Sequence, residues 1–392
     1  MTNLQNSLIG KTIPFSAQRQ VLVKEELPRG ATCRCYVCEV KYVDGTTETK
    51  LLKEFAPKNF DLFFSKDTFL RTIASRKEGF ELAFKKYFNK ISEVRSILLK
   101  IAKEDNSLKR YFVLPPAVQF QKDNSNPDNA GDSIVVFNSE QSEYCGLMLF
   151  DFDSTSMSCR IGELSIDARI EALIKLSKVI NKFHERNLII ADIKPENFIY
   201  DVDDVGFCIK LFDFDSVIDL NEKITKVSCT LKWAPYELSQ QLLNAIGLSS
   251  DLYSLGAMLL YFIMFDLFQN YPKYKLVNFL HEQNKQEVLT KDVFLQLCDI
   301  DNNVTIGFWN KFVEIVNTTT NLQNPERRCP KDYTLPLDYF IEQLVILKEI
   351  YENKGVHPEV MLNNAIKDVQ NKKKFSADNF DPDLFTEVEV VE

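Results

Sequence analysis

The chain has 392 residues, 45% of them hydrophobic, and a formal net charge of −9. This length allows two or three ordinary domains with a real core, and the acidic balance argues against nucleic acid or an anionic membrane as the main partner. The N-terminus has no basic region followed by an apolar run, and the longest apolar run, residues 255–265, is shorter than the roughly 20 residues that a bilayer crossing needs. Nine cysteines favour a reducing compartment, so we expect a cytoplasmic protein without a secretory signal.

The first part of the chain predicts a small, mostly antiparallel sheet with one long helix. Strands are expected within residues 21–55, 111–120, 133–137 and 143–153. A turn at Asp44-Gly45 separates two of them. Residues 67–103 carry the apolar spacing of a helix that lies against the sheet.

From residue 165 onward the pattern becomes helical. An amphipathic helix is predicted to begin near Ser165, and its apolar face consists of Ile170, Leu173, Ile174, Leu176, Ile180 and Phe183. The helix after Asp251 is hydrophobic nearly all round, which predicts a buried central helix. Further helices are expected within residues 275–320 and 336–352. The change from strands to helices predicts two lobes that meet near residues 151–155.

These patterns divide the chain into four parts. They are an N-terminal segment (1–20), a small lobe (21–153), a large lobe (154–352) and a C-terminal extension with an acidic tail (353–392). The composition of the tail is typical of a solvated, flexible segment, and a docking segment is the alternative.

Residues 188–216 carry the chemical information. They place Asp192, Lys194 and Asn197 in the order D-x-K-P-x-x-N, and Asp213 follows in D-F-D. Phosphoryl transfer from ATP to a hydroxyl needs a carboxylate that orients the hydroxyl and a lysine that meets the charge on the moving phosphoryl group. It also needs an amide and a carboxylate that hold magnesium. The segment resembles the catalytic loop and metal-binding turn of eukaryotic-type Ser/Thr protein kinases.

This resemblance implies an α+β, bilobal protein-kinase-like fold, with a small antiparallel sheet in the N-lobe and a mainly helical C-lobe. It makes Asp192 the catalytic aspartate and places Lys194 near the γ-phosphate of ATP, where lysine points to Ser/Thr substrates. Asn197 and Asp213 would hold Mg²⁺, with Mn²⁺ as the alternative ion.

Three further segments resemble kinase motifs. Residues 250–256 are similar to S-D-x-W-S-L-G, in which the aspartate braces the catalytic loop through backbone N–H groups. Residues 230–237 resemble the substrate-binding loop T-x-x-Y-x-A-P-E with one residue inserted, and residues 324–330 resemble D-P-x-x-R-P. The resemblance implies that Arg328 and Glu237 form a buried pair.

The N-terminal part matches the family less well. Residues 27–36 line up with the glycine-rich loop, but only Gly30 remains of its three glycines. Pro28 and Cys33 therefore predict a stiffer and looser lid over the phosphates. Lys53 fits the strand lysine that contacts the α- and β-phosphates, and a solvated strand lysine is the alternative.

The strand lysine needs a carboxylate partner on the helix behind it. Glu93 is the first choice, and Glu78 and Glu81 remain alternatives. The expected nucleotide-binding set is therefore Gly30, Lys53, Glu93, Asn197 and Asp213.

The cysteines of the small lobe form a C-x-C-x-x-C cluster at Cys33, Cys35 and Cys38. No second cysteine pair or histidine is close in sequence, and the segment is rich in strand formers. We expect cysteines of a strand rather than zinc ligands.

Three departures from the family pattern bear on activity. Ala191 replaces an arginine that meets an activating phosphate, so activation by loop phosphorylation is not expected. Asp215 replaces the glycine of D-F-G and adds a carboxylate beside the metal site. This change would slow the rearrangement of the turn or bias the choice of divalent ion. Leu51 stands where a small alanine usually covers adenine, so the nucleotide pocket should be narrower.

Three functions are compatible with these residues. The leading hypothesis is an ATP- and Mg²⁺-dependent Ser/Thr protein kinase that acts on a protein substrate. The second is a pseudokinase that serves as a nucleotide-binding scaffold, and the third is a small-molecule phosphotransferase. The sequence leaves the substrate, the pathway and the oligomeric state open.

Overall fold

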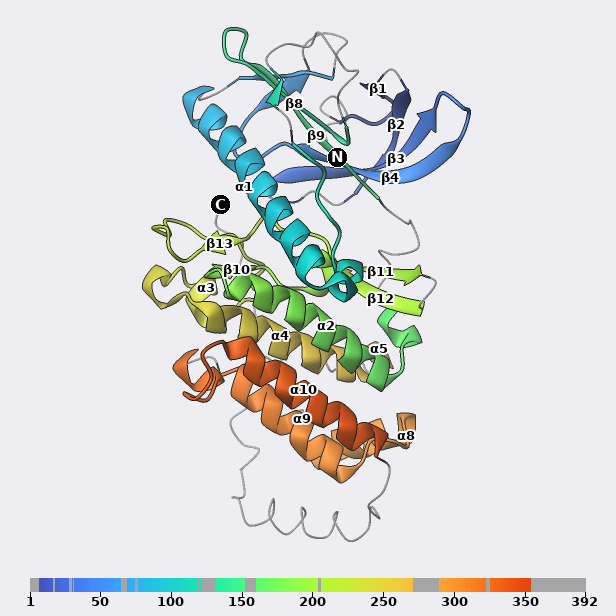
Figure 1. Cartoon of the computed structure of the whole chain (residues 1–392), viewed down its shortest axis with the longest axis vertical. Coiled ribbons are helices and arrows are strands. Elements are labelled where there is room, and N and C mark those ends of the chain that lie inside the picture. The colour runs from blue at the N-terminus through green and yellow to red at the C-terminus, as the bar shows by residue number, and fades with distance from the viewer. Residues whose placement is uncertain are drawn as a thin grey trace, which may run out of the picture.

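The structure is a computed structural model that describes residues 7–16, 18–27, 30, 32–64, 69–74, 77–118, 120–121, 131–151, 160–203, 206–270, 289–321 and 325–353. A sheet with one long helix lies above a group of helices, as Figure 1 shows. This arrangement confirms the predicted α+β, two-lobed architecture.

The sheet of the small lobe has nine strands within the described residues. They are β1 (Thr12–Ser16), β2 (Arg19–Glu26), β3 (Cys33–Tyr42), β4 (Thr47–Phe55), β5 (Leu62–Phe64), β6 (Arg71–Ile73), β7 (Phe120–Gln121), β8 (Ser133–Asn138) and β9 (Glu143–Asp151). The order is β1-β2-β3-β4-β9-β6-β5, and β8 pairs with β9 and with β7. The sheet begins at Thr12, within the segment that we expected to precede the small lobe.

Alternation along β3 determines which side chains face the helix α1. Cys33 packs in the apolar cluster beneath the helix α1 (Lys77–Glu104), whereas Tyr36, Cys38 and Val40 lie in the cluster on the opposite face. Successive side chains of a strand point to opposite faces, so Cys33 and Cys38 cannot bind one metal ion. The same alternation in β4 directs Lys53 to the α1 face and its neighbour Glu54 to the other.

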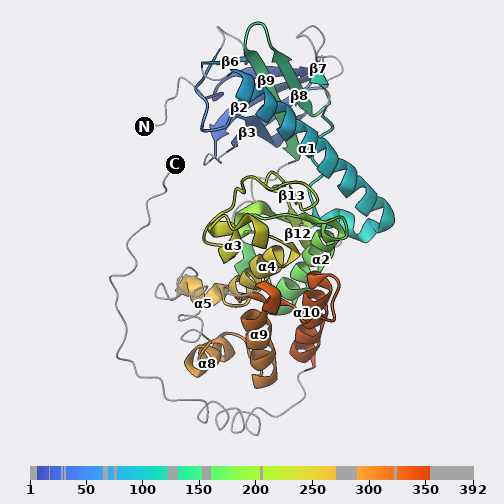
Figure 2. The same ribbon diagram turned by 90° about the vertical axis from the view of Figure 1, so that its left-hand side faces the viewer.

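The α1 helix crosses one face of the sheet in both views (Figure 1 and Figure 2). Its buried aromatic residues pack against rings from the strands. The ring centroids of Phe80 and Tyr144 are 4.3 Å apart, and those of Phe84 and Phe55 are 5.6 Å apart. This packing determines which face of α1 lies against the sheet.

Two predicted elements of the small lobe differ from the structure. The helix begins at Lys77 rather than near 67, and β6 occupies Arg71–Ile73, within the range predicted to be helical. Arg71 of β6 is buried in a pair with Glu54, with Nε 2.6 Å from Oε1. The predicted strand at 111–120 is reduced to β7, because the consecutive prolines 115 and 116 cannot donate to a strand ladder.

The large lobe consists mainly of helices. They are α2 (Ile166–His184), α3 (Tyr236–Ser239), α4 (Leu248–Ile263), α5 (Phe265–Asn270), α8 (Lys291–Ile300), α9 (Ile306–Thr319) and α10 (Pro336–Glu352). Short strands complete it: β10 (Leu188–Ile189), β11 (Phe198–Asp203), β12 (Gly206–Leu211) and β13 (Ile218–Asp219). Short 3-10 helices lie at Asn106–Tyr111, Arg160–Glu163, Pro195–Asn197, Leu243–Ala245 and Pro325–Arg328.

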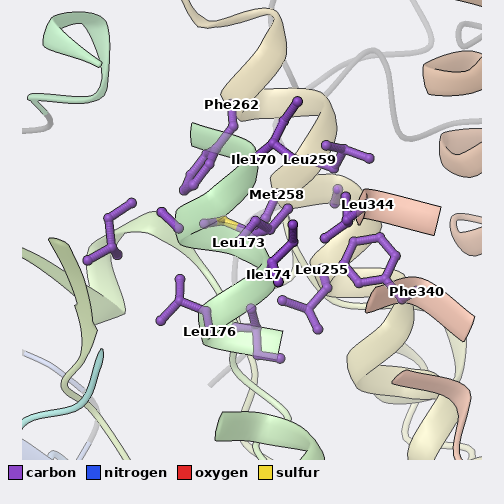
Figure 3. Packing of buried hydrophobic residues seen from close by; sticks show 14 of the residues in the cluster. Ile170, Leu173, Ile174, Leu176, Leu255, Met258, Leu259, Phe262, Phe340 and Leu344 are labelled. Carbon is purple, nitrogen blue, oxygen red and sulfur yellow. The ribbon is translucent and has the colours of Figure 1, made fainter. Parts of the chain in front are cut away.

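The core of the large lobe lies between α2, α4 and α10, as Figure 3 shows. The helix α2 begins directly after Ser165, as predicted, and all six residues of its predicted apolar face are buried. The central helix α4 is buried over nearly its whole length, which confirms that prediction. No helix in the described part of the chain is both long and apolar enough to span a membrane.

Three predicted regions lie wholly or partly outside the described residues. The predicted junction of the lobes, residues 151–155, is described only at residue 151, the last residue of β9. Residues 271–288 precede α8, so only α8 and α9 represent the helices predicted within 275–320. The C-terminal extension is described only at residue 353.

Gly256 allows α4 to pack closely against the end of α9. A Cβ atom at this position would lie 2.8 Å from Cβ of Thr319 and would overlap its Oγ1, and Thr319 is fully buried. We expect Gly256→Ala to lower the free energy of unfolding by about 1–3 kcal/mol, because overpacking forces backbone shifts. Denaturant unfolding measures the change.

Gly307→Ala is the matched control, because its added Cβ would meet its nearest neighbour, Ile350 Cγ2, at 3.7 Å. We expect no loss of stability in this variant, since alanine also favours the helix. Equal stability of the two variants would contradict the close packing at Gly256.

Candidate active site

The hairpin of β11 and β12 brings the two predicted metal ligands together. Asn197 directly precedes β11, and Asp213 follows two residues after β12. Phe198 pairs with Leu211, and the backbone N–H of Phe212 donates to the backbone oxygen of Asn197 at 2.9 Å. Both ligands therefore lie at the same end of one hairpin.

The carboxylate of Asp192 is held from two sides. Its Oδ1 accepts a hydrogen bond from the backbone N–H of Thr230 at 2.8 Å, and its Oδ2 lies 2.8 Å from Nζ of Lys194. The Lys194 ammonium also donates to Oγ1 of Thr230 at 2.6 Å. The catalytic loop and the substrate-binding loop predicted from the sequence thus meet at Asp192.

A buried carboxylate supports this loop from below. Asp251 is fully buried and accepts the N–H groups of Ile190 at 2.7 Å and Ala191 at 2.9 Å. Its Oδ2 also lies 3.0 Å from Nε2 of His184. Ala191 has a φ of 63°, a left-handed conformation that L-residues rarely adopt. The contacts of Asp251 offset that strain and confirm the bracing role predicted for it.

The side-chain oxygen atoms at the end of the hairpin fit a hard divalent cation. The Asn197 amide nitrogen donates to the backbone oxygen of Asp192 at 2.7 Å, which leaves the amide oxygen as the atom for a metal. Asp213 adds a carboxylate. The part of the chain that the structure describes contains no cluster of three His, Cys, Asp or Glu residues suited to a metal. Mg²⁺ suits such a pair, because it takes its other ligands from phosphates and water.

Lys53 reaches this site from the small lobe. Its side chain is buried, so the alternative of a solvated strand lysine is wrong. Its Nζ lies 2.9 Å from Oδ1 of Asp213 and 2.8 Å from Oδ2 of Asp215. These contacts join β4 to the turn after β12 and connect the two lobes.

The charges of this cluster shift one another's protonation. Burial alone would lower the pKa of the Lys53 ammonium, but the charges of Asp213 and Asp215 outweigh it and hold that pKa above its ordinary value. Burial and the charge of Asp213 raise the pKa of Asp215. At Asp213 the charge of Lys53 outweighs burial and lowers the pKa.

The structure does not bring Glu93 to Lys53. Glu93 lies on the exposed side of α1, and Glu81, a second candidate, pairs with Lys85 at 2.7 Å. The side chain of Glu78 is outside the described residues. Among the described residues of α1, Tyr87 contacts the Asp215 carboxylate: its hydroxyl donates to Oδ1 of Asp215 at 3.1 Å.

The sequence did not single out Tyr87, because its place in the helix reads as part of an apolar face. The carboxylate of Asp215, two residues after Asp213, was the available signal that Lys53 has another partner. The sequence pattern places that carboxylate beside the metal, whereas the structure places it on the lysine.

The glycine-rich segment is described only in part. Gly30 is exposed, and an added Cβ would lie 3.4 Å from the backbone oxygen of Cys33. Pro28 lies outside the described residues. Leu51 is 1% exposed and packs in the apolar cluster beneath α1. The contributions of Gly30 and Leu51 to nucleotide binding stay predictions.

The segment predicted to bind substrate, residues 230–237, is joined to the 3-10 helix Pro325–Arg328 by a buried ion pair. The Arg328 guanidinium donates to both carboxylate oxygens of Glu237, at 2.6 and 3.0 Å. Ser250 Oγ donates to the same carboxylate at 2.8 Å. This contact confirms the predicted pairing of Arg328 and Glu237.

Comparison with known families agrees with this geometry. The model of the protein kinase domain matches residues 135–331, which include Asp192, Lys194, Asn197 and Asp213. Lys53 lies before the matched region. No curated protein sequence matches the chain. The matched region spans half of the chain, and the protein therefore belongs to the protein kinase family.

Proposed function

We propose that the protein is an ATP- and Mg²⁺-dependent Ser/Thr protein kinase, which transfers the γ-phosphate of ATP to a hydroxyl group of a protein substrate. The observation that carries this proposal is that both oxygens of the Asp192 carboxylate are held. The Lys194 ammonium and the Thr230 backbone N–H each lie 2.8 Å from one of them. A general base must be held in this way to orient a hydroxyl.

The residues divide the reaction among them. Asp192 accepts the proton of the substrate hydroxyl as its oxygen attacks the γ-phosphorus, and the bond from that phosphorus to the bridging oxygen of ADP breaks. Lys194 offsets charge on the transferred group, and Lys53 holds the α- and β-phosphates. Asn197 and Asp213 would hold Mg²⁺, which would supply positive charge against the phosphates.

The preference for Ser/Thr rests on Lys194. Lysine two residues after the catalytic aspartate is the pattern of kinases that phosphorylate serine and threonine. Here its ammonium contacts Thr230 Oγ1 at 2.6 Å as well as Asp192. The proposed acceptor is therefore an aliphatic hydroxyl of a protein placed beside Asp192.

The alternative is a pseudokinase that binds nucleotide without transferring phosphate. One observation favours it: Lys53 Nζ contacts two carboxylates, at 2.8 and 2.9 Å, which compete with phosphate for the ammonium. A small-molecule phosphotransferase ranks last, since the segments around Glu237 and Arg328 resemble those of protein kinases.

We also propose a cytoplasmic location. The cysteines whose side chains the structure describes are free thiols: Cys33, Cys35, Cys38, Cys145, Cys229, Cys298 and Cys329. Burial raises the pKa of the Cys35 and Cys229 thiols to about 11, which keeps them protonated. Free thiols in this number suit a reducing compartment.

Metal removal tests the proposed function. The full chain, incubated with labelled ATP, Mg²⁺ and a generic basic Ser/Thr protein, should incorporate phosphate, and EDTA should abolish the incorporation. Asp213→Asn should lower the rate by about 100-fold or more, because a metal ligand is lost. Glu222→Gln, an exposed change in the following loop, should leave the rate unchanged.

Two other outcomes would contradict the proposal. If no phosphate is incorporated but ATP raises the melting temperature, and Asp213→Asn weakens that rise, the protein is a pseudokinase. If ATP neither reacts nor stabilises the protein, the protein is neither a kinase nor a nucleotide-binding pseudokinase.

A further inference from the structure

Lys53 has two carboxylate partners, and both come from one turn. Asp213 Oδ1 lies 2.9 Å from its ammonium, and Asp215 Oδ2 lies 2.8 Å from it. The backbone N–H of Asp215 also donates to Asp213 Oδ1 at 3.1 Å. Under the proposed function Asp213 must bind a metal ion, so Lys53 needs another group to hold it in place.

Asp215 is fixed more firmly than Asp213. Its side chain is 15% exposed, against 31% for Asp213. Its Oδ1 accepts the Tyr87 hydroxyl at 3.1 Å, and its backbone oxygen accepts Nζ of Lys90, also at 3.1 Å. Both of these donors belong to α1. Asp215 thus binds β4 through one carboxylate oxygen and α1 through the other.

Tyr87 is itself held in place. Its side chain is buried against Phe55, with ring centroids 4.8 Å apart. The thiol of Cys33 donates to its hydroxyl at 3.2 Å. The Tyr87 hydroxyl therefore accepts a hydrogen bond from the Cys33 thiol and donates its own proton to the Asp215 carboxylate, which fixes the direction of that proton.

The backbone at position 215 gives no reason for a glycine. Asp215 does not have a positive φ, unlike Ala191 in the catalytic loop. An L-residue fits this turn without strain, and the aspartate side chain has two polar contacts, with Lys53 and with Tyr87, to account for its presence.

We propose that Asp215 is the positioning carboxylate for Lys53 and that the Tyr87 hydroxyl anchors it to α1, so that the turn supplies the charge expected from a helix glutamate. This inference rests on the proposed function, because it assigns Lys53 to the phosphates of ATP. It follows that Asp213 can leave Lys53 for the metal while the ammonium keeps a carboxylate.

The test compares Asp215→Gly and Asp215→Asn with wild type in the full chain. Two quantities are measured: kcat with its KM for ATP, and the gain in ATP affinity that Mg²⁺ gives over EDTA. Without Asp215, the carboxylate of Asp213 must stay on Lys53. We expect kcat and the Mg²⁺-dependent gain both to fall, by about 10- to 100-fold for kcat, as for the loss of a charged hydrogen bond.

Two further variants separate positioning from folding. Glu93→Gln is the control for the helix glutamate and should change neither quantity by more than about twofold, since its side chain is exposed. Tyr87→Glu in the Asp215→Gly background returns a carboxylate to the site from α1. It should recover most of the lost kcat, which a purely structural role of Asp215 would not allow. Melting temperatures identify any variant that does not fold.

The outcomes are distinct. Unchanged or higher kcat and Mg²⁺-dependent gain in Asp215→Gly, or an equal loss in Glu93→Gln, would overturn the inference. If wild type transfers no phosphate, the proposed function fails. The inference is then decided by the Mg²⁺-dependent gain in ATP affinity alone, which should still fall in both Asp215 variants.

Discussion

Replacement of Asp192 by asparagine is expected to lower the rate of phosphate transfer by about 100- to 10,000-fold, the range that general-base catalysis supplies. The amide keeps the shape of the side chain and can still accept the Thr230 N–H, which donates to Asp192 Oδ1 at 2.8 Å. It cannot take up the proton of the attacking hydroxyl, and it loses its charge attraction to Lys194. Steady-state transfer from labelled ATP measures the effect.

The matched control is Glu196→Gln in the same loop. Glu196 is exposed and lies between the buried Pro195 and Asn197. This variant removes one negative charge at nearly the same place in the sequence, so its rate should equal that of wild type. A fall of similar size in both variants would mean that charge in this region matters rather than the base. Full activity of Asp192→Asn would exclude Asp192 as the base.

Loss of the buried carboxylate at position 237 should have the largest effect on stability. Arg328 is fully buried and Glu237 is 1% exposed, and their side chains form two hydrogen bonds, at 2.6 and 3.0 Å. Glu237→Gln leaves the guanidinium charge of Arg328 buried without a counter-charge. We expect the free energy of unfolding to fall by about 3–5 kcal/mol, as measured by denaturant unfolding.

An exposed ion pair provides the comparison. Arg186 NH2 lies 3.4 Å from Glu104 Oε1, and the Glu104 side chain is 50% exposed. Glu104→Gln should cost less than about 1 kcal/mol, because solvent screens the pair. The double variant Glu237→Gln/Arg328→Met should be more stable than the sum of the single changes predicts. Equal effects of Glu237→Gln and Glu104→Gln would contradict this account of the buried pair.

The two lobes differ in how far they follow the family pattern. The match to the protein kinase domain covers residues 135–331, so the strands β1 to β6 and the helix α1 lie before it. That part contains Lys53, whose two carboxylate contacts, with Asp213 and Asp215, both come from the turn after β12. The Lys53 ammonium needs a carboxylate beside it, and the element that supplies this carboxylate can differ.

The sequence by itself determined the features that depend on short spacing. Asp192, Lys194 and Asn197 lie within six residues of one another, so the loop that joins them holds them together in any fold that forms it. The period of the apolar residues in α2 likewise determined which of its faces is buried. The pairing of Glu237 with Arg328, 91 residues apart, was available only through the resemblance to the family.

Only the tertiary structure decided which residue of α1 reaches Asp215, the carboxylate beside Lys53. Glu93 and Tyr87 are six residues apart, which on a helix is about 9 Å along the axis and about 240° around it. Which of them reaches the site depends on where α1 begins and on how its aromatic face lies on the sheet. Residues Arg71–Ile73 form the strand β6 instead of an early turn of the helix, and the packing of Phe80 and Phe84 then turns Tyr87 toward Asp215. No local pattern contains that information, because it comes from contacts between segments far apart in the chain.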